Sequence, residues 1–247
     1  MLNEYRRQLD AIDDALVDAF SERLGTIDAI SAYKRAHHID AYDPDREREM
    51  LERLTSRVPE NRREAVKALY ASILAISKAQ QRFENTNLVL IGMPGAGKTA
   101  IARRLSKLLN RPIASTDEEV ERRIEMPIEA LFRAEGEVAF RTIETEVVRS
   151  LSAVWGSIIA TGGGTILSEQ NRSILRENSR IYYIKRPLAA LDTAGRPLSQ
   201  GPGALERLYD ERHAIYETFA DVQLDADDDF AVTAQLIAEE FRSHFQF

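Results

Sequence analysis

The stretch from Leu88 to Leu105 constrains the fold most strongly, because it joins an apolar run to a glycine-rich loop and then to a helical pattern. The loop fits G-x-x-x-x-G-K-[ST], with Gly92, Gly97, Lys98 and Thr99 at the fixed positions. Such a loop binds phosphate when a strand precedes it and a helix follows it. Its glycines let backbone N–H groups approach phosphate oxygens, and the helix N-terminus adds partial positive charge. The sequence therefore predicts a nucleotide-binding α/β domain.

Short apolar runs alternate with helical patterns along the rest of the chain after residue 86. These runs are "NLVLIG", "RPIAST", "GSIIAT", "RIYYI" and "DVQL". Alternation of this kind predicts βα repeats, with a parallel sheet covered by helices on both faces. Ligands of such open sheets bind beyond the carboxyl ends of the strands.

The first 83 residues have a helical period instead. Apolar residues recur at steps of three and four from Leu2 to Ile30, which predicts one helix of about 50 Å ending near Ala36. Two short helices cannot cover a helix of that length, so we expect a second copy of the chain to pack along it.

Two further helices are expected in this region. Asp43 suits an N-cap and Pro44 a first helical position, so a second helix should run to about Thr55. A third should run from Pro59 to about Arg82. Residues 83–87 then form a short polar linker.

Composition excludes several classes of function. The net charge of −7 argues against a general nucleic-acid binder, and the absence of cysteine excludes disulfides, thiolate metal sites and a cysteine nucleophile. The charged start "MLNEYRRQLD" does not resemble a signal peptide, and no apolar stretch reaches the roughly 18 residues of a membrane span. We expect a cytoplasmic enzyme or regulator without nucleic-acid or membrane partners.

Residues suited to binding a phosphate acceptor follow the predicted strands. Asp117 follows the second strand and "ATGGGT" ends the third, while Arg141, Arg196 and Arg212 lie in later segments. A carboxylate can orient a hydroxyl or accept its proton, and arginines can clamp a carboxylate by bidentate pairing. Together they indicate a small polyhydroxy acid as acceptor.

From Asn87 onward the chain resembles the shikimate kinase family. The motifs are the phosphate loop, Asp after strand two, F-R-x-x-E from Phe140 to Glu144, the glycine triplet, R-P-L at Arg196 and R-x-x-x-Y at Arg212. The resemblance implies ATP and Mg²⁺ as cofactors, with Lys98 and Asp117 as catalytic residues and Thr99 at the metal. The implied ATP contacts are Gly92, Gly95, Ala96, Gly97, Lys98, Thr99, Ala100 and Arg196 in the lid. The implied shikimate contacts are Asp117, Arg141, Gly162, Gly163, Gly164 and Arg212.

Three departures from this family fall on the nucleotide and metal side. Ser115 stands where the family has a metal-binding Asp, the segment before Arg196 is short and lacks an arginine that stacks on adenine, and "DADDDF" stands where a basic contact is common. We therefore expect weak ATP or Mg²⁺ affinity, or low activity, with the acceptor unchanged.

A second candidate site lies in the helical region. On a helix, Ile27, Ile30 and Lys34 all fall within about 40° of Arg23, with Lys34 about 16 Å further along the axis. An amphipathic core stripe with solvated ends is the alternative for an isolated helix. A pocket is favoured because further polar groups begin or share faces of the other helices. They are Arg46, Glu47, Ser77 and Gln81.

This region resembles the all-helical chorismate mutase family from Leu2 to Gln81. The matching positions are Arg6 to Asp13, Arg23 to Lys34, Asp43 to Glu47, and Ser77 to Gln81. The resemblance implies an intertwined dimer in which Arg6 enters the partner's active site. It implies Lys34, Gln81, Arg23 and Arg6 as catalytic residues. The implied chorismate contacts are Arg6, Arg23, Lys34, Asp43, Arg46, Glu47, Ser77 and Gln81.

The combined prediction is a multi-domain, bifunctional enzyme of aromatic amino-acid biosynthesis. An all-α three-helix mutase domain (1–83, an intertwined dimer) would precede an α/β phosphate-loop kinase domain with a parallel sheet (87–247). Two alternatives stay open: the helical domain is a chorismate or prephenate sensor for the kinase, or the kinase domain is a degenerate ligand-binding module. A nucleotide or gluconate kinase would leave the glycine triplet and Arg141 unexplained.

Overall fold

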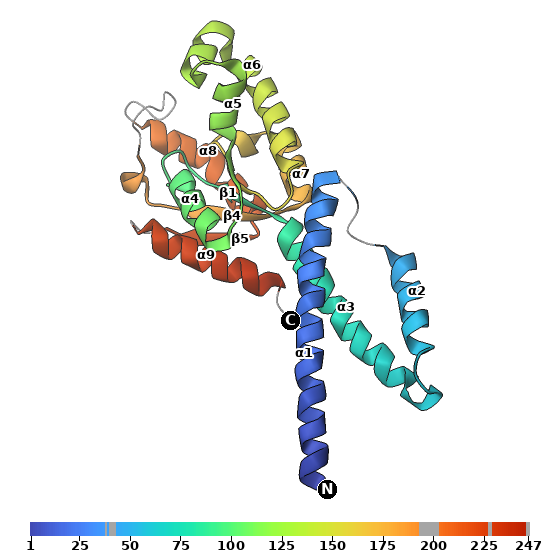
Figure 1. Cartoon of the computed structure of the whole chain (residues 1–247). Helices are drawn as coiled ribbons and strands as arrows, with labels where there is room; N and C mark the ends of the chain where they lie inside the picture. The colour runs from blue at the N-terminus through green and yellow to red at the C-terminus, as the bar shows by residue number, and fades with distance from the viewer. Residues whose placement is uncertain (38, 40–42, 193–202, 227–228, 246–247) are drawn as a thin grey trace. The chain divides into compact units, whose positions relative to one another are not determined.

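The computed structural model describes residues 1–37, 39, 43–192, 203–226 and 229–245. These divide into two compact units, Met1–Asn85 with Phe245, and Thr86–His244, which Figure 1 shows as a helical part and an α/β part. No helix in the described ranges is long and apolar enough to cross a membrane.

The helical unit contains the three predicted helices. They are α1 (Leu2–His37), α2 (Pro44–Thr55) and α3 (Arg63–Asn85), the last preceded by the 3₁₀ turn η1 (Glu60–Arg62). The predicted cap of α2 is confirmed, because Asp43 Oδ1 accepts a hydrogen bond from Arg46 N at 3.0 Å.

The polar linker predicted for residues 83–87 is wrong. Helix α3 continues to Asn85, and the first strand begins at Asn87. Arg35 Nη1 donates to the Glu84 carbonyl at 3.0 Å and to Asn85 Oδ1 at 3.3 Å. These bonds from α1 satisfy groups at the C-terminal end of α3, where carbonyls lack partners within the helix.

Side-chain hydrogen bonds join the second half of helix α1 to α3. They link Arg23 to Ser77, Asp28 to Gln80 and Arg35 to Glu84. The first half of α1 instead carries large apolar side chains with more than half of their surface exposed. These are Leu2, Tyr5, Leu9, Ile12, Leu16 and Val17. The apolar stripe read from the sequence therefore exists, but one chain leaves its N-terminal half uncovered.

All five predicted strands are present in the α/β unit. They are β1 (Asn87–Ile91), β2 (Ile113–Ser115), β3 (Ile158–Ala160), β4 (Ser179–Lys185) and β5 (Val222–Asp225). They form one parallel sheet in the order β2-β3-β1-β4-β5. Strand β1 is central and every one of its residues is buried, as expected when helices cover both faces.

Six α-helices and two short 3₁₀ turns complete the described part of this unit. The helices are α4 (Lys98–Leu109), α5 (Thr116–Ile124), α6 (Ile128–Ser152), α7 (Glu169–Glu177), α8 (Ala204–Phe219) and α9 (Phe230–Phe245), and the turns are η2 (Thr165–Leu167) and η3 (Leu188–Ala190). Helices α4 and α9 lie together on one face, where Arg242 Nη2 donates to the Leu108 carbonyl at 2.7 Å, and α7 and α8 cover the other (Figure 1).

Helix α6 is interrupted at Gly136, whose φ of 80° and ψ of −178° are not helical. A residue with a Cβ would be strained there. The break lets both parts of α6 pack on α5 around one apolar cluster of Val120, Leu131, Phe140 and Val147. Arg141 comes directly after Phe140 of this cluster, so the apolar core between α5 and α6 fixes the backbone from which the Arg141 side chain extends.

Candidate active sites

The phosphate loop connects β1 to α4 as predicted. Gly97 has φ 86° immediately before the first residue of α4, Lys98. Lys98 is 7% exposed, and its Nζ donates to the carbonyls of Gly92 (2.8 Å) and Met93 (2.9 Å). The ammonium is thus held over the loop, where a phosphate chain would meet it together with the N–H groups of the helix N-terminus.

The glycine triplet after β3 permits three close approaches. A Cβ on Gly163 would lie 2.6 Å from Pro94 of the phosphate loop, and one on Gly162 would lie 2.3 Å from Asp117 Oδ1. A Cβ on Gly164 would lie 2.7 Å from Arg141 Nη2. The triplet therefore holds the phosphate loop, the candidate carboxylate and the candidate arginine around one short segment.

Arg141 is held by two carboxylates of different burial. Its Nη1 donates to Glu144 Oε2 at 2.7 Å, and its Nη2 donates to Glu137 Oε1 at 3.0 Å. The Glu144 side chain is 1% exposed and the Glu137 side chain 58%. Burial acts to lower the pKa of Arg141, but the two carboxylates outweigh it and the pKa is raised. Arg141 therefore stays charged.

The hydroxyl groups of two threonines form a buried network with the Glu144 carboxylate. Thr165 Oγ1 donates to Glu144 Oε1 at 2.7 Å, and Gly162 N donates to Thr116 Oγ1 at 2.7 Å. The two threonine hydroxyls are 3.5 Å apart. The sequence did not anticipate this buried network, which ties Arg141 to the ends of both β2 and β3.

Helix α8 supplies the second candidate arginine. Arg212 is 4% exposed, and one turn further the Tyr216 hydroxyl donates to the Gly163 carbonyl. Burial raises the pKa of Tyr216, so its hydroxyl keeps the proton for that bond. The Tyr216 ring stacks on Tyr183 of β4 with centroids 5.0 Å apart.

One cavity of about 980 Å³ joins the phosphate loop to the candidate acceptor groups. Most of the predicted kinase residues line it, namely Gly95, Gly97, Lys98, Thr99, Ala100, Asp117, Arg141, Gly162, Gly163, Gly164 and Arg212. Gly92 and Ala96 are buried inside the loop and do not line the cavity. Arg196 lies outside the described residues.

The donor set fits a magnesium ion bound with a nucleotide. The Thr99 hydroxyl, Ser115 and the carboxylates of Asp117 and Glu118 line the same cavity, and Mg²⁺ is usually held by one or two carboxylates with substrate phosphates and water. Ser115 Oγ itself accepts from Glu118 N at 3.4 Å as the N-cap of α5.

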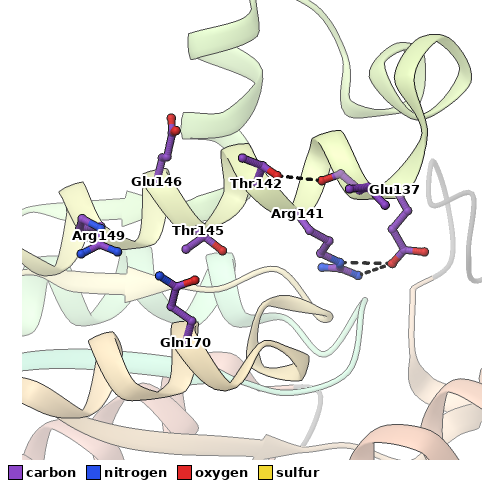
Figure 2. Close-up of a pocket in the computed structure, with 8 residues that line it drawn as sticks. Glu137, Arg141, Thr142, Thr145, Glu146, Arg149 and Gln170 are labelled. Atoms are coloured by element: carbon purple, nitrogen blue, oxygen red, sulfur yellow. Dashed lines mark hydrogen bonds and ion pairs between the residues drawn. The ribbon is translucent and has the colours of Figure 1, made fainter.

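A shallower hollow of about 590 Å³ lies along the outer side of α6 (Figure 2). Glu137 and Arg141 are at one end, Arg149 is at the other, and Gln170 of α7 faces Thr145 across it. Figure 2 shows Arg141 paired with Glu137 at this end. Arg141 thus separates the solvent side of α6 from the inner cavity.

The helical unit brings part of its predicted site together. Arg23 Nη1 donates to Ser77 Oγ, and Glu47 Oε2 accepts from Lys78 Nζ at 2.8 Å, a contact that the sequence did not indicate. The other candidates differ in exposure: Lys34 and Gln81 are half-buried, whereas Asp43, Arg46 and Arg6 are exposed. Arg6 precedes Arg23 by about 25 Å along α1, too far to enter the same pocket from its own chain.

The α/β unit is similar in sequence to known shikimate kinases. A sequence model of the family described as Shikimate kinase matches residues 94–243. The shikimate kinase of Moorella thermoacetica is 38% identical over 165 residues, covering 64% of this chain and 95% of that protein. That of Dictyoglomus turgidum is 36% identical over 152 residues, covering 58% and 88%.

Solved structures give the same relationship. A structure of shikimate kinase from Acinetobacter baumannii in complex with shikimate has a TM-score of 0.63 and 31% identity, and the match covers 67% of this chain and 98% of that one. The shikimate kinase structure from Aquifex aeolicus has a TM-score of 0.56 and 28% identity, with 64% and 97% covered.

The helical unit matches a different family. A sequence model described as Chorismate mutase type II matches residues 5–82, nearly the whole of α1 to α3. The two matches do not overlap, and together they account for most of the polypeptide. The chain therefore belongs to the shikimate kinase family and carries, ahead of its kinase domain, a chorismate mutase type II domain, which makes it a bifunctional enzyme of aromatic biosynthesis.

Proposed function

We propose that the α/β unit transfers the γ-phosphoryl group of ATP to the 3-hydroxyl of shikimate. One observation carries this proposal: the phosphate loop, a carboxylate (Asp117) and two arginines (Arg141 and Arg212) line the same cavity. A donor held by the loop would thus meet an acceptor that has both a hydroxyl for Asp117 and a carboxylate for the arginines.

Each group has a role that follows from its surroundings. Asp117, held against Gly162, would orient the attacking hydroxyl and accept its proton. Arg141 and Arg212 would pair with the shikimate carboxylate, and the glycine triplet would let the ring lie close to the backbone. Lys98 would leave the loop carbonyls for the β and γ phosphates and stabilise the charge on the transferring group. Thr99 would hold a Mg²⁺ ion, which would supply positive charge to neutralise the phosphates.

The test is ADP release by the full chain with Mg-ATP, with and without shikimate, compared with Lys98→Ala. We expect release that requires shikimate and falls by at least about 100-fold in Lys98→Ala, the usual loss for a charge-stabilising group. Release that is independent of shikimate, or that Lys98→Ala leaves unchanged, would contradict the proposal.

We further propose that the helical unit rearranges chorismate to prephenate. This reaction needs no nucleophile or metal, so the protein's task is to hold the reactive diaxial conformer through its two carboxylates. Arg23, fixed by Ser77, and the half-buried Lys34 are suited to these carboxylates and to the ether oxygen. Gln81 would also donate to the ether oxygen as the C–O bond breaks, and Glu47 would bind the ring hydroxyl.

The exposed apolar half of α1 supports a homodimer in which each site is shared. Six side chains from Leu2 to Val17 are uncovered, and Arg6 lies among them. A second α1 running antiparallel would cover this stripe and bring its Arg6 towards Arg23 of the first chain. Both the dimer and the shared site are part of the proposal.

Mixing two inactive variants tests this arrangement. Arg6→Ala and Arg23→Ala would each disable both sites of their own dimer. A mixed dimer would regain one intact site, formed by Arg23 of one chain and Arg6 of the other. Random exchange gives about half mixed dimers, so about a quarter of wild-type mutase activity should return. No recovery under conditions of proven exchange would rule out a site that uses Arg6 from the partner.

We propose residues 1–83 and 87–247 as the two functional domains, working in the cytoplasm, where ATP is available. The sensor and degenerate-kinase alternatives are not favoured, because each unit matches an enzyme family and the kinase unit keeps Lys98 and Thr99.

A further inference from the structure

Glu47 lies on the inward face of α2. Its side chain is 25% exposed, whereas the side chains of Asp45 and Arg48 on the same helix are more than two-thirds exposed. Glu47 shares this half-buried face with Met50 and Leu54, which follow it at helical spacing. A carboxylate on such a face is costly unless it has a partner.

Lys78 of α3 supplies that partner. Its Nζ donates to Glu47 Oε2 at 2.8 Å, and the two residues are 31 positions apart in the sequence. Among the residues that the structure describes, no group donates to the second carboxylate oxygen, Oε1. The bond therefore fixes one oxygen of the carboxylate and leaves the other for a ligand.

Two neighbouring residues of α3 hold candidate groups of both other helices. Ser77 accepts a hydrogen bond from Arg23 Nη1 of α1, and Lys78 donates to Glu47 of α2. Successive residues of a helix point about 100° apart, so the two bonds leave α3 in different directions. Gln81, one turn further along α3, is half-buried. Lys78 therefore lies at the edge of the proposed chorismate site.

We propose that Lys78 is a positioning residue of the mutase site, which holds Glu47 ready for the ring hydroxyl of chorismate. This inference rests on the proposed mutase function and adds a residue that acts through another side chain. A glutamate without a partner loses rotamer freedom when a ligand binds to it, and this loss weakens binding. The bond to Lys78 orders Glu47 before the ligand arrives, so the ligand binds more tightly.

The test compares the full-length wild type with Lys78→Met and Lys78→Arg in chorismate consumption. Methionine removes the charge, whereas arginine keeps it. We expect the KM for chorismate to rise about tenfold in Lys78→Met, since ordering one side chain on binding costs up to that factor. The value of kcat should stay within about threefold, because the hydroxyl is bound alike in the ground state and the transition state. Lys78→Arg should restore the wild-type KM within about threefold.

A double variant shows whether Lys78 acts through Glu47. Glu47→Gln should itself raise the KM for chorismate. Adding Lys78→Met to Glu47→Gln should raise the KM less than about twofold further, because the carboxylate that Lys78 positions is then absent. Independent effects would instead multiply, with a tenfold rise in each background. That outcome, or a wild-type KM in Lys78→Met alone, would overturn the proposal.

Lys67→Met is the matched control on the same helix. Lys67 Nζ donates to Glu64 Oε1 at 2.8 Å, and both side chains are more than half exposed. This variant removes a lysine–glutamate pair of the same length that involves none of the candidate site residues, so its KM should match that of the wild type. A tenfold rise there would show that the KM responds to any loss of charge on α3, which contradicts a specific role for Lys78.

Binding of prephenate separates this inference from the mutase function. Prephenate, the proposed product, has a ring hydroxyl and two carboxylates, and calorimetry gives its Kd without turnover. If the wild type binds prephenate but does not convert chorismate, the mutase function fails. A tenfold rise of the Kd in Lys78→Met would then still support the positioning role, and an unchanged Kd would overturn it. If the wild type neither converts chorismate nor binds prephenate, both proposals fail.

Discussion

Replacing Glu144 by glutamine should disable the kinase site without touching a substrate-contacting residue. Glu144 accepts from Arg141 and from Thr165 at 2.7 Å each, and its side chain is 1% exposed. Glutamine keeps the size but removes the charge, and its amide group must face either Arg141 or Thr165 as a competing donor. Arg141 would lose its buried partner and keep only Glu137, which would draw it outward.

The expected effect follows from this geometry. A displacement of about 1 Å in a substrate-positioning group lowers the rate about 100-fold. We therefore expect kcat/KM for shikimate to fall about 100-fold, which corresponds to a loss of about 2.7 kcal/mol of transition-state stabilisation. The free energy of unfolding should fall by about 2 kcal/mol, less than for a fully buried pair because Arg141 is 24% exposed.

Glu137→Gln is the matched control, because it removes the other carboxylate of the same arginine. Glu137 is 58% exposed, so its pair with Arg141 contributes only about 0.5 kcal/mol. Steady-state kinetics with varied shikimate, with folding checked by circular dichroism, should show less than a threefold loss. A similar loss of activity in both variants, or wild-type behaviour of Glu144→Gln, would show that Glu144 does not position Arg141.

Three other predictions test separate parts of the molecule. Ile12→Asp puts a charge in the exposed apolar stripe of α1, through which we propose that two chains pair. It should convert the proposed dimer to monomers in sedimentation analysis, because a Leu or Ile side chain contributes about 1.5–3 kcal/mol on burial. Mutase activity should be lost and kinase activity kept within twofold. Ser115→Asp should lower the Mg²⁺ concentration for half-maximal kinase rate several-fold without lowering Tm, because Asp caps a helix as well as Ser; an unchanged Mg²⁺ requirement would count against a metal next to β2. The hydrogen bond from Arg122 holds the pKa of Glu119 at about 2, so this carboxylate stabilises the fold fully above its ordinary pKa and less as pH falls towards 2. Glu119→Gln should therefore cost about 1 kcal/mol at pH 7 and clearly less at pH 3 in urea unfolding.

Local patterns in the sequence were sufficient for the architecture. The helix of α1, the cap at Asp43 and all five strands follow from periodicity and from capping residues, because these signals act over a few positions. The prediction of a linker after Arg82 was wrong because it depended on a contact between residues far apart in the sequence. The polar residues there do not end α3, since Arg35 reaches across from α1 to its last turn.

The candidate kinase site was predictable as a set of residues but not as a network. The motif carries Arg141 and Glu144, yet nothing local links them to Thr165 and Thr116, which come together only when β2 and β3 pair. The stretch that ends in Phe230 indicated only a missing basic contact. Its ring rests on Gly97 because α9 begins beside the phosphate loop, more than 130 residues later in the chain.

A paired activity measurement on the full-length protein would determine whether one chain carries two separate active sites. Shikimate-dependent ADP release and chorismate consumption would be measured on the same preparations of wild type, Lys98→Ala and Arg23→Ala. We expect both activities in the wild type, loss of only the kinase activity in Lys98→Ala and loss of only the mutase activity in Arg23→Ala. A wild-type protein that lacks either activity, or a single substitution that abolishes both, would contradict the assignment of two separate active sites.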